Sequence, residues 1–315
     1  MNYLDLSVIE EEYYWNLYKQ LRSFAWSPED YPLDNFQKLF DSGDNNVECF
    51  IKLFSYLVFL DSTQVRMIPE FSLINGSGSP ELLCLLAEHH SQEAVHCHSY
   101  QYITSPLKED MRRRVYSEMH NNKYLYQRSQ QILEPYKCYL DDKTNLNKLA
   151  RAYFADYLLE GFLFSNGFLS MLYNENIFPK ISTIIKLIWR DEKLHVLIFK
   201  SLVKQMLVNG VITSDECEEI GSNILKNELI WLSEVMGDFV PYGKMKLHSE
   251  WLMNKCLSDV GVSKRDKDLS NPFKYLYDRN NTKAKTNPME GKSSNYSVFT
   301  GLQFSEAFNL KIEQK

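Results

Sequence analysis

The sequence predicts an all-α fold, a helical bundle that holds a dinuclear metal site in a four-helix core. A Glu-x-x-His pattern occurs twice, with Glu93 and His96 in one copy and Glu192 and His195 in the other. Residues three apart on a helix lie on one face, so each pair can bind a metal ion. The chain shows neither strand alternation nor a glycine-rich phosphate loop. Two such pairs, with one carboxylate from each of two further helices, form the ligand set of a carboxylate-bridged dinuclear site.

An internal repeat identifies the two further carboxylates. Asp61 precedes Glu93 by 32 residues, and Glu160 precedes Glu192 by the same interval, so the two halves match with one offset of 99 residues. Both acids adjoin apolar runs, where a carboxylate must be paired, protonated or bound to metal. The alternative for Asp61 is a turn toward solvent near the helix end. A single Glu-x-x-His pair arises easily by chance, whereas two copies with acids at matched distances favour a metal site.

Apolar periodicity and breaking residues define the first two helices. Residues 10–22 carry tyrosine and leucine at helical spacing, and the segment ends before Pro28. Residues 45–67 form the second helix, whose centre is almost entirely apolar. Pro69 is expected to stop it, because proline lacks the N–H that a helix interior needs.

Three of the following helices carry the remaining candidate ligands. Residues 80–104 are predicted to be helical, with Ser79 as N-cap. Residues 108–139 are polar and are expected to form one or two connecting helices on a solvated flank. Residues 144–172 form the next long helix, rich in aromatic side chains around Glu160. Three more helices are predicted after it: 181–208, 214–235 and 244–257.

Several side chains of the 80–104 helix can extend the metal-facing stripe. Tyr100 follows His96 by four residues, so its phenol lies one turn further along. His89 precedes Glu93 by four residues and could approach the site. Two other histidines point away from the stripe and are predicted to be partly exposed: His90 and His98.

Composition excludes several classes of protein. The net charge is −6 with no basic block, which argues against nucleic-acid binding. The six cysteines form no C-x-x-C pair, which favours a reduced, intracellular chain over a disulfide framework or a structural zinc site. The N-terminal residues lack a signal pattern, and no apolar run reaches the length of about 18 residues typical of a membrane span. We therefore expect a soluble, cytoplasmic protein that does not enter a membrane.

The ligand types favour iron or manganese. Carboxylates with one histidine per metal in an apolar bundle suit Fe or Mn, which can reduce bound oxygen species. Zinc would require more cysteine or histidine, and calcium or magnesium would not select histidine. Tyr100 is placed to receive the oxidising equivalent; a plain core tyrosine is the alternative.

Four motifs, in this order and at these intervals, resemble the small (β, radical-generating) subunit of class I ribonucleotide reductase. They are Leu60-Asp61-Ser62, Glu93-x-x-His96-x-x-Ser99-Tyr100, Leu159-Glu160-Gly161-Phe162 and Arg190-Asp191-Glu192-x-x-His195. The resemblance covers about residues 20 to 200 and implies a ferritin-like helical bundle. It also implies two Fe ions or two Mn ions per chain, one bound by Asp61, Glu93 and His96 and the other by Glu160, Glu192 and His195.

The same resemblance implies radical storage and an electron-transfer route. Tyr100 matches the position of the stored tyrosyl radical, with Phe164 and Phe168 in the apolar pocket that shields it. Trp26 matches a tryptophan near the chain start, and Asp191 the aspartate that links it to His96. In the C-terminal part, Ser293-Ser294-Asn295-Tyr296 resembles the segment of the relay tyrosine, so Tyr296 is the relay candidate.

The resemblance further implies a division of the chain and a set of partners. Residues 1–262 are expected to form the ferritin-like radical-generating domain, and residues 263–315 a partly disordered, flexible C-terminal tail that docks on the large (α) subunit. The last residues, 309–315, depart from the acidic and aromatic ending of many relatives. A homodimer is implied, and for manganese a flavodoxin-like activator.

Two alternatives stand beside this function. One is a ferritin-like di-metal oxidase or monooxygenase that acts directly on an organic substrate, against which Asp61, Tyr100 and the tyrosine-bearing tail argue. The other is iron storage or a structural bundle, which would lack the pair of Trp26 and Asp191. The six ordinary ligands argue against metal-free variants, and Tyr100 argues against the mixed Mn/Fe type.

Overall fold

The computed structural model describes residues 4–33, 40–41, 45–72, 78–264 and 266–281, and these residues contain helices and connecting segments but no strand. The predicted all-α fold is confirmed. Contacts divide the chain into two units, Met1–Pro272 and Phe273–Lys315. The predicted functional boundary between 262 and 263 stays a prediction. None of the helices in the described ranges combines the length and apolar character that a membrane span needs.

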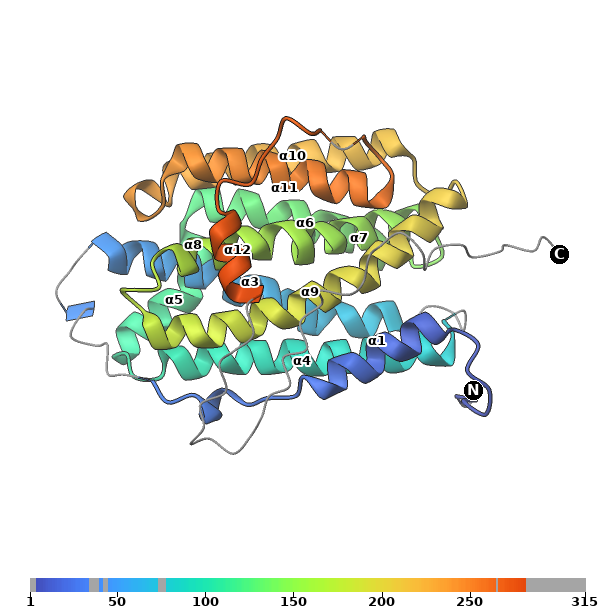
Figure 1. Cartoon of the computed structure of the whole chain (residues 1–315), viewed down its shortest axis with the longest axis horizontal. Coiled ribbons are helices and arrows are strands. Elements are labelled where there is room, and N and C mark those ends of the chain that lie inside the picture. The colour runs from blue at the N-terminus through green and yellow to red at the C-terminus, as the bar shows by residue number, and fades with distance from the viewer. Residues whose placement is uncertain (1–3, 34–39, 42–44, 73–77, 265, 282–315) are drawn as a thin grey trace. The chain divides into compact units, whose positions relative to one another are not determined.

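Among the described residues, the long helices all lie in the first unit (Figure 1). They are, in order, α1 (Glu12–Ser23), α3 (Asn45–Ser72), α4 (Pro80–Thr104), α5 (Glu109–Asn121), α6 (Lys123–Asp141), α7 (Leu146–Leu158), α8 (Phe164–Tyr173), α9 (Pro179–Val208), α10 (Ser214–Glu234) and α11 (Tyr242–Val260).

Four long helical segments form the core that positions the candidate site. Helix α3 packs along α4, and the continuous segment of α7 and α8 packs along α9. Contacts of α4 with α9 and of α3 with α8 join these two pairs. Helix α1 lies across α4 and α9, whereas α10 and α11 run side by side beyond α6 and α7 (Figure 1). The two pairs correspond to the two halves of the sequence repeat.

A π-helical turn, Leu159–Leu163 (η2), separates α7 from α8. The sequence predicts one uninterrupted helix over residues 144–172, and the π turn shows that this prediction is wrong. A π turn accommodates one extra residue, and such turns occur frequently at functional sites. Here Glu160 lies within the turn and is buried.

Two further predictions, one for α3 and one for the segment that contains α6, are wrong. Helix α3 continues through Pro69 to Ser72, because Phe71 packs against Tyr136, Tyr153 and other rings and this burial offsets the missing hydrogen bond. The segment 108–139 is not only a solvated flank, since the inner face of α6 is buried and includes Arg128.

The start of helix α4 follows its predicted cap, and α11 ends at a glycine. Helix α4 has the predicted bounds, and the hydroxyl of Ser79 accepts a hydrogen bond of 3.1 Å from the N–H of Leu82. Gly261, with φ of 89°, ends α11 in the left-handed region. The second unit contributes one described helix, α12 (Lys274–Asn281), which the polar composition of that segment does not predict.

A buried ion pair joins three helices beside the core. Arg128 on α6 pairs with Glu228 on α10, and both side chains are fully buried. The guanidinium carbon of Arg128 lies 3.3 Å from the ring centre of Tyr56 on α3 and 4.0 Å from that of Trp231 on α10. The two rings therefore enclose the cation, which strengthens its attraction to their faces.

We expect Arg128→Met to lower the free energy of unfolding by about 3–5 kcal/mol, because it leaves the Glu228 carboxylate buried without its partner. Urea unfolding of the metal-free protein measures the change, with Arg113→Met as control because its pair with Glu109 is exposed. The double variant Arg128→Met/Glu228→Leu should regain most of the loss. Wild-type stability of Arg128→Met would contradict this interpretation.

Candidate metal centre

All six predicted metal ligands meet in the interior of the four-helix core. Asp61 comes from α3, Glu93 and His96 from α4, Glu160 from the π turn, and the last two from α9: Glu192 and His195. Each is at most 1% exposed. Their arrangement defines two groups of potential ligands that share Glu93, and within each group the ligand atoms lie within 4.8 Å of one another.

The first group consists of Asp61, Glu93, His96 and Glu192. The Nδ1 atom of His96 lies 3.0 Å from Glu192 Oε1, 3.2 Å from Asp61 Oδ1 and 3.8 Å from Glu93 Oε2. One ring nitrogen therefore faces three carboxylates from three helical segments. This is the arrangement expected of a metal-binding histidine.

The second group consists of Glu93, Glu160, His195 and His89. The Nδ1 atom of His195 lies 2.9 Å from Glu93 Oε1 and 4.0 Å from Glu160 Oε2, and also 2.6 Å from Glu192 Oε2. The expectation that His89 could approach the site is confirmed. Its Nε2 atom lies 3.0 Å from Glu93 Oε1 and 3.2 Å from Glu160 Oε1.

Gln92, which the sequence analysis did not identify, fixes the orientation of His195. Its amide N–H donates a hydrogen bond of 2.9 Å to the carbonyl of Leu21, so its Oε1, 2.9 Å from His195 Nε2, accepts from the ring. With the proton on Nε2, the Nδ1 lone pair points at the carboxylates. Burial lowers the pKa of His195, which favours this neutral ring.

A second group of buried residues supports Glu160. Gln64 donates hydrogen bonds to Glu160 and to Asp156, and Tyr136 donates to the carbonyl oxygen of Gln64 at 3.2 Å. Burial raises the pKa of Asp156 well above its ordinary value. The sequence does not indicate that Gln64 and Tyr136 belong to the site, and for Asp156 the only indication is its position one turn before Glu160.

The polar atoms of the site fit a pair of cations. Several buried atoms in the described part of the chain make no hydrogen bond, namely both oxygens of Asp61, both ring nitrogens of His96, Oε2 of Glu93, Oε2 of Glu160 and Oε1 of Glu192. Unpaired buried charge is costly, and coordination to metal removes that cost. The four carboxylates also balance the charge of two divalent cations. These residues therefore fit a dinuclear metal site.

Burial and mutual repulsion change the pKa values of the acids. Burial raises the pKa of Asp61 to about 7, despite the opposing effect of His96. Burial, reinforced by the charge of neighbouring glutamates, raises the pKa of Glu160 and of Glu192 to about 8. For Glu93, burial is outweighed by hydrogen bonds from histidines, and the pKa is lowered.

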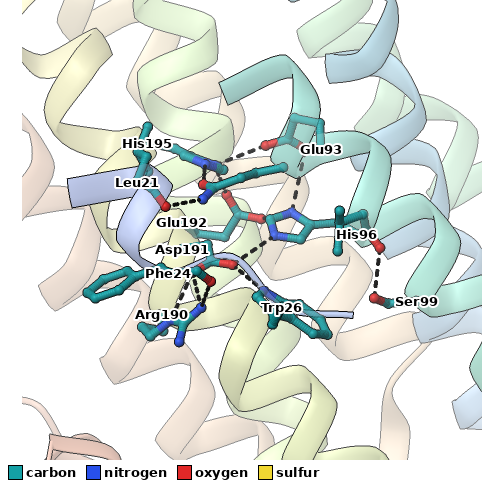
Figure 2. Close-up of polar contacts among 12 residues, drawn as sticks. Leu21, Phe24, Trp26, Glu93, His96, Ser99, Arg190, Asp191, Glu192 and His195 are labelled. Carbon is teal, nitrogen blue, oxygen red and sulfur yellow. Dashed lines mark hydrogen bonds and ion pairs between the residues drawn. The ribbon is translucent and has the colours of Figure 1, made fainter. Parts of the chain in front are cut away.

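A chain of polar contacts connects the first group to the N-terminal segment (Figure 2). The indole N–H of Trp26 donates to Asp191 Oδ2 at 2.7 Å, and the same oxygen lies 3.5 Å from His96 Nε2. Arg190 donates to Asp191 Oδ1 at 2.9 Å and to the carbonyl of Phe24 at 2.7 Å. The predicted association of Trp26, Asp191 and His96 is therefore present in the structure.

Tyr100 lies on α4 one turn beyond His96 and is fully buried. Its hydroxyl makes no hydrogen bond with the described residues, and its ring packs edge-on against Phe54 at 5.8 Å. Burial, with the charge of Asp61, raises the pKa of the phenol well above its ordinary range. Phe164 and Phe168 are buried and stacked on each other at 5.3 Å. Tyr296 lies outside the described residues.

Comparisons with a family model and with related sequences both match this chain to the small chain of ribonucleotide reductase. The family described as "Ribonucleotide reductase, small chain" matches residues 4–272. The chain is 26% identical over 313 residues to the ribonucleoside-diphosphate reductase subunit beta of Halalkalibacterium halodurans, covering 94% of this chain and 89% of the relative.

Two solved structures share the fold. A putative class I ribonucleotide reductase from Bacillus halodurans aligns with a TM-score of 0.78 at 24% identity, covering 85% of this chain and 99% of that chain. The ribonucleotide reductase R2 subunit from Clostridium botulinum aligns with a TM-score of 0.79 at 23% identity, covering 88% and 91%.

We expect binding of Mn(II) to release protons and to weaken as the pH falls from 8 to 6. Asp61, Glu160 and Glu192 have raised pKa values of about 7 to 8, so they carry protons over this range and the cations must displace them. Calorimetric titration in buffers of different ionisation enthalpy counts the protons. Glu160→Gln should release fewer, and affinity independent of pH would contradict the expectation.

Proposed function

This chain belongs to the ribonucleotide reductase small-chain family, and from that premise we propose that Tyr100 stores the radical that this subunit supplies for reduction of ribonucleotides to deoxyribonucleotides. The observation that carries the proposal is the position of Tyr100. The residue is buried, lies one turn from His96, and has a hydroxyl that makes no hydrogen bond with the described residues. A dry and apolar environment protects a phenoxyl radical from water and from other reductants.

We propose that the site takes two Fe ions or two Mn ions, with Asp61, Glu93 and His96 on one and Glu160, Glu192 and His195 on the other. When bound, the pair supplies the one-electron oxidant. Oxidation of Tyr100 would remove an electron and its phenolic proton, and we propose Asp61, whose charge acts on this phenol, as the acceptor of that proton. The pair of manganese ions would require a flavodoxin-like activator.

The chain of Trp26, Asp191 and His96 is proposed as the route by which the radical leaves the site. Trp26 is only partly buried, whereas Asp191 and His96 are fully buried, so the chain runs from the metal ligands toward the surface. Indole and phenol are both oxidisable side chains. Tyr296 is proposed as the next relay, within a C-terminal tail, residues 263–315, that binds the large subunit.

We further propose a homodimer of this subunit, as family membership suggests, and a cytoplasmic location. All six cysteines are free, which supports a reducing compartment.

Direct oxidation of an organic substrate has less support. A cavity of about 150 Å³ is walled by residues such as Phe71, Leu86 and Tyr153, and none of the metal-site residues lines it. An oxidase that acts on its own substrate needs a pocket that reaches the metals. This cavity therefore does not supply a substrate site at the metals.

We expect Tyr100→Phe to abolish the tyrosyl radical signal in electron paramagnetic resonance after Fe(II) loading and exposure to oxygen, because phenylalanine has no phenol to oxidise. The matched control is Tyr153→Phe, which alters another buried tyrosine outside the ligand groups and should keep the signal. Metal content should be unchanged in both variants. A persistent signal in Tyr100→Phe would exclude this residue as the storage site.

We expect Trp26→Phe to retain the Tyr100 radical but to lower turnover with the large subunit by about 100-fold, or ~2.7 kcal/mol in activation free energy. The substitution removes both the oxidisable indole and its hydrogen bond to Asp191. Trp15→Phe is the control, since Trp15 lies on α1 and stacks on Tyr18 at 5.0 Å. Unchanged turnover in Trp26→Phe would remove this residue from the route.

A further inference from the structure

A third histidine, His89, lies within the second ligand group. It occupies α4 one turn before Glu93, so both side chains project from the same face. Both His89 and Glu93 are fully buried. The ring centre of His89 lies 3.9 Å from that of His195, and both rings border the same carboxylates.

The Nε2 atom of His89 has the surroundings of a metal ligand. It lies 3.0 Å from Glu93 Oε1 and 3.2 Å from Glu160 Oε1, and its ligand atom clusters with those of Glu93, Glu160 and His195 within 4.8 Å. The opposite nitrogen, Nδ1, has no hydrogen-bond partner among the described residues, and the ring is edge-on to Phe199 at 5.8 Å. All polar interactions of His89 are therefore on the side of the metal site.

The internal repeat shows that this histidine makes the two halves unequal. The offset of 99 residues that relates Glu93 to Glu192 and His96 to His195 relates His89 to Ile188. Ile188 is buried and cannot bind metal. One half of the repeat thus offers an imidazole where the other offers a hydrocarbon.

We propose that His89 is a second nitrogen ligand to the metal ion held by Glu93, Glu160 and His195. This inference rests on the dinuclear site of the proposed function and gives its two ions different ligand sets. One ion then has two imidazoles and the other has one. An imidazole that binds a metal ion is neutral, so on coordination the charge balance between four carboxylates and two divalent cations is unchanged. Because imidazole suits transition ions better than magnesium or calcium, the ion beside His89 binds first and more selectively.

The alternative is that His89 only donates a hydrogen bond to Glu93 and Glu160. Two substitutions separate these roles. His89→Phe removes the nitrogen and keeps a ring of similar size against Phe199, whereas His89→Gln keeps a polar group near the carboxylates. His90→Phe is the matched control, because His90 is the next residue of α4 and is only partly buried.

The test uses Mn(II) and the full chain, with two readouts. Calorimetry of the metal-free protein measures the two binding steps, and pulsed electron paramagnetic resonance on protein with ¹⁵N-labelled histidine, loaded with less than one Mn(II) per chain, counts the coordinated imidazoles. Wild type and His90→Phe should show two imidazoles on the first ion bound. Both His89 variants should show one imidazole. Their first binding step should also weaken by roughly tenfold or more, since loss of a residue that only hydrogen-bonds to a metal ligand already lowers metal affinity about tenfold.

Each outcome decides between the roles. An unchanged imidazole count in His89→Phe would overturn the proposal, and so would affinity equal to wild type. A weaker first step with two imidazoles retained would assign His89 to hydrogen bonding and also overturn it. Circular dichroism of the metal-free variants shows whether they fold. If wild type binds no pair of Mn(II) or Fe(II) ions, the dinuclear site of the proposed function fails as well, which is a different result from the loss of one nitrogen.

Discussion

Four carboxylates packed together in a buried helical core are the constraint on which this structure depends. Like charges at this separation repel, and burial removes the solvent that would screen them. The core is therefore complete only when cations, or protons in their place, occupy the space between Asp61, Glu93, Glu160 and Glu192. The surrounding helices contribute the apolar side chains that keep water out, so the same packing that stabilises the bundle also strengthens metal binding.

The histidines show how the fold orients ligands as well as supplying them. In His96 and in His195, Nδ1 faces the carboxylates while Nε2 contacts a polar group behind the ring, Asp191 in one case and Gln92 in the other. Such contacts fix the tautomer and the ring plane before a metal arrives. His89 has no such group behind it among the described residues, so packing against Phe199 and His195 has to hold its ring.

The six predicted ligands come together because helical spacing is a strict geometric rule, and the repeat offset of 99 residues is a second, independent test of it. The features that the sequence did not predict depend on tertiary contacts. The π turn at Glu160 has no local sequence signal, the extension of α3 past Pro69 depends on the rings that surround Phe71, and the buried face of α6 depends on the distant Glu228. Gln64 and Gln92 were missed because an amide in a helix shows no preference for a metal site until its neighbours are known.

The contacts of the N-terminal segment have a consequence for the geometry of the site. Gln92, which orients His195, is held by the carbonyl of Leu21, and Arg190, which holds Asp191, is held by the carbonyl of Phe24. Both are main-chain contacts, so they depend on the path of this segment and not on its side chains. The N-terminal segment thus holds two side chains that support the metal site, those of Gln92 and Arg190, which lie 71 and 166 residues further along the chain. The orientation of His195 and of Asp191 seen in the structure therefore requires the first helix to be in place against the bundle.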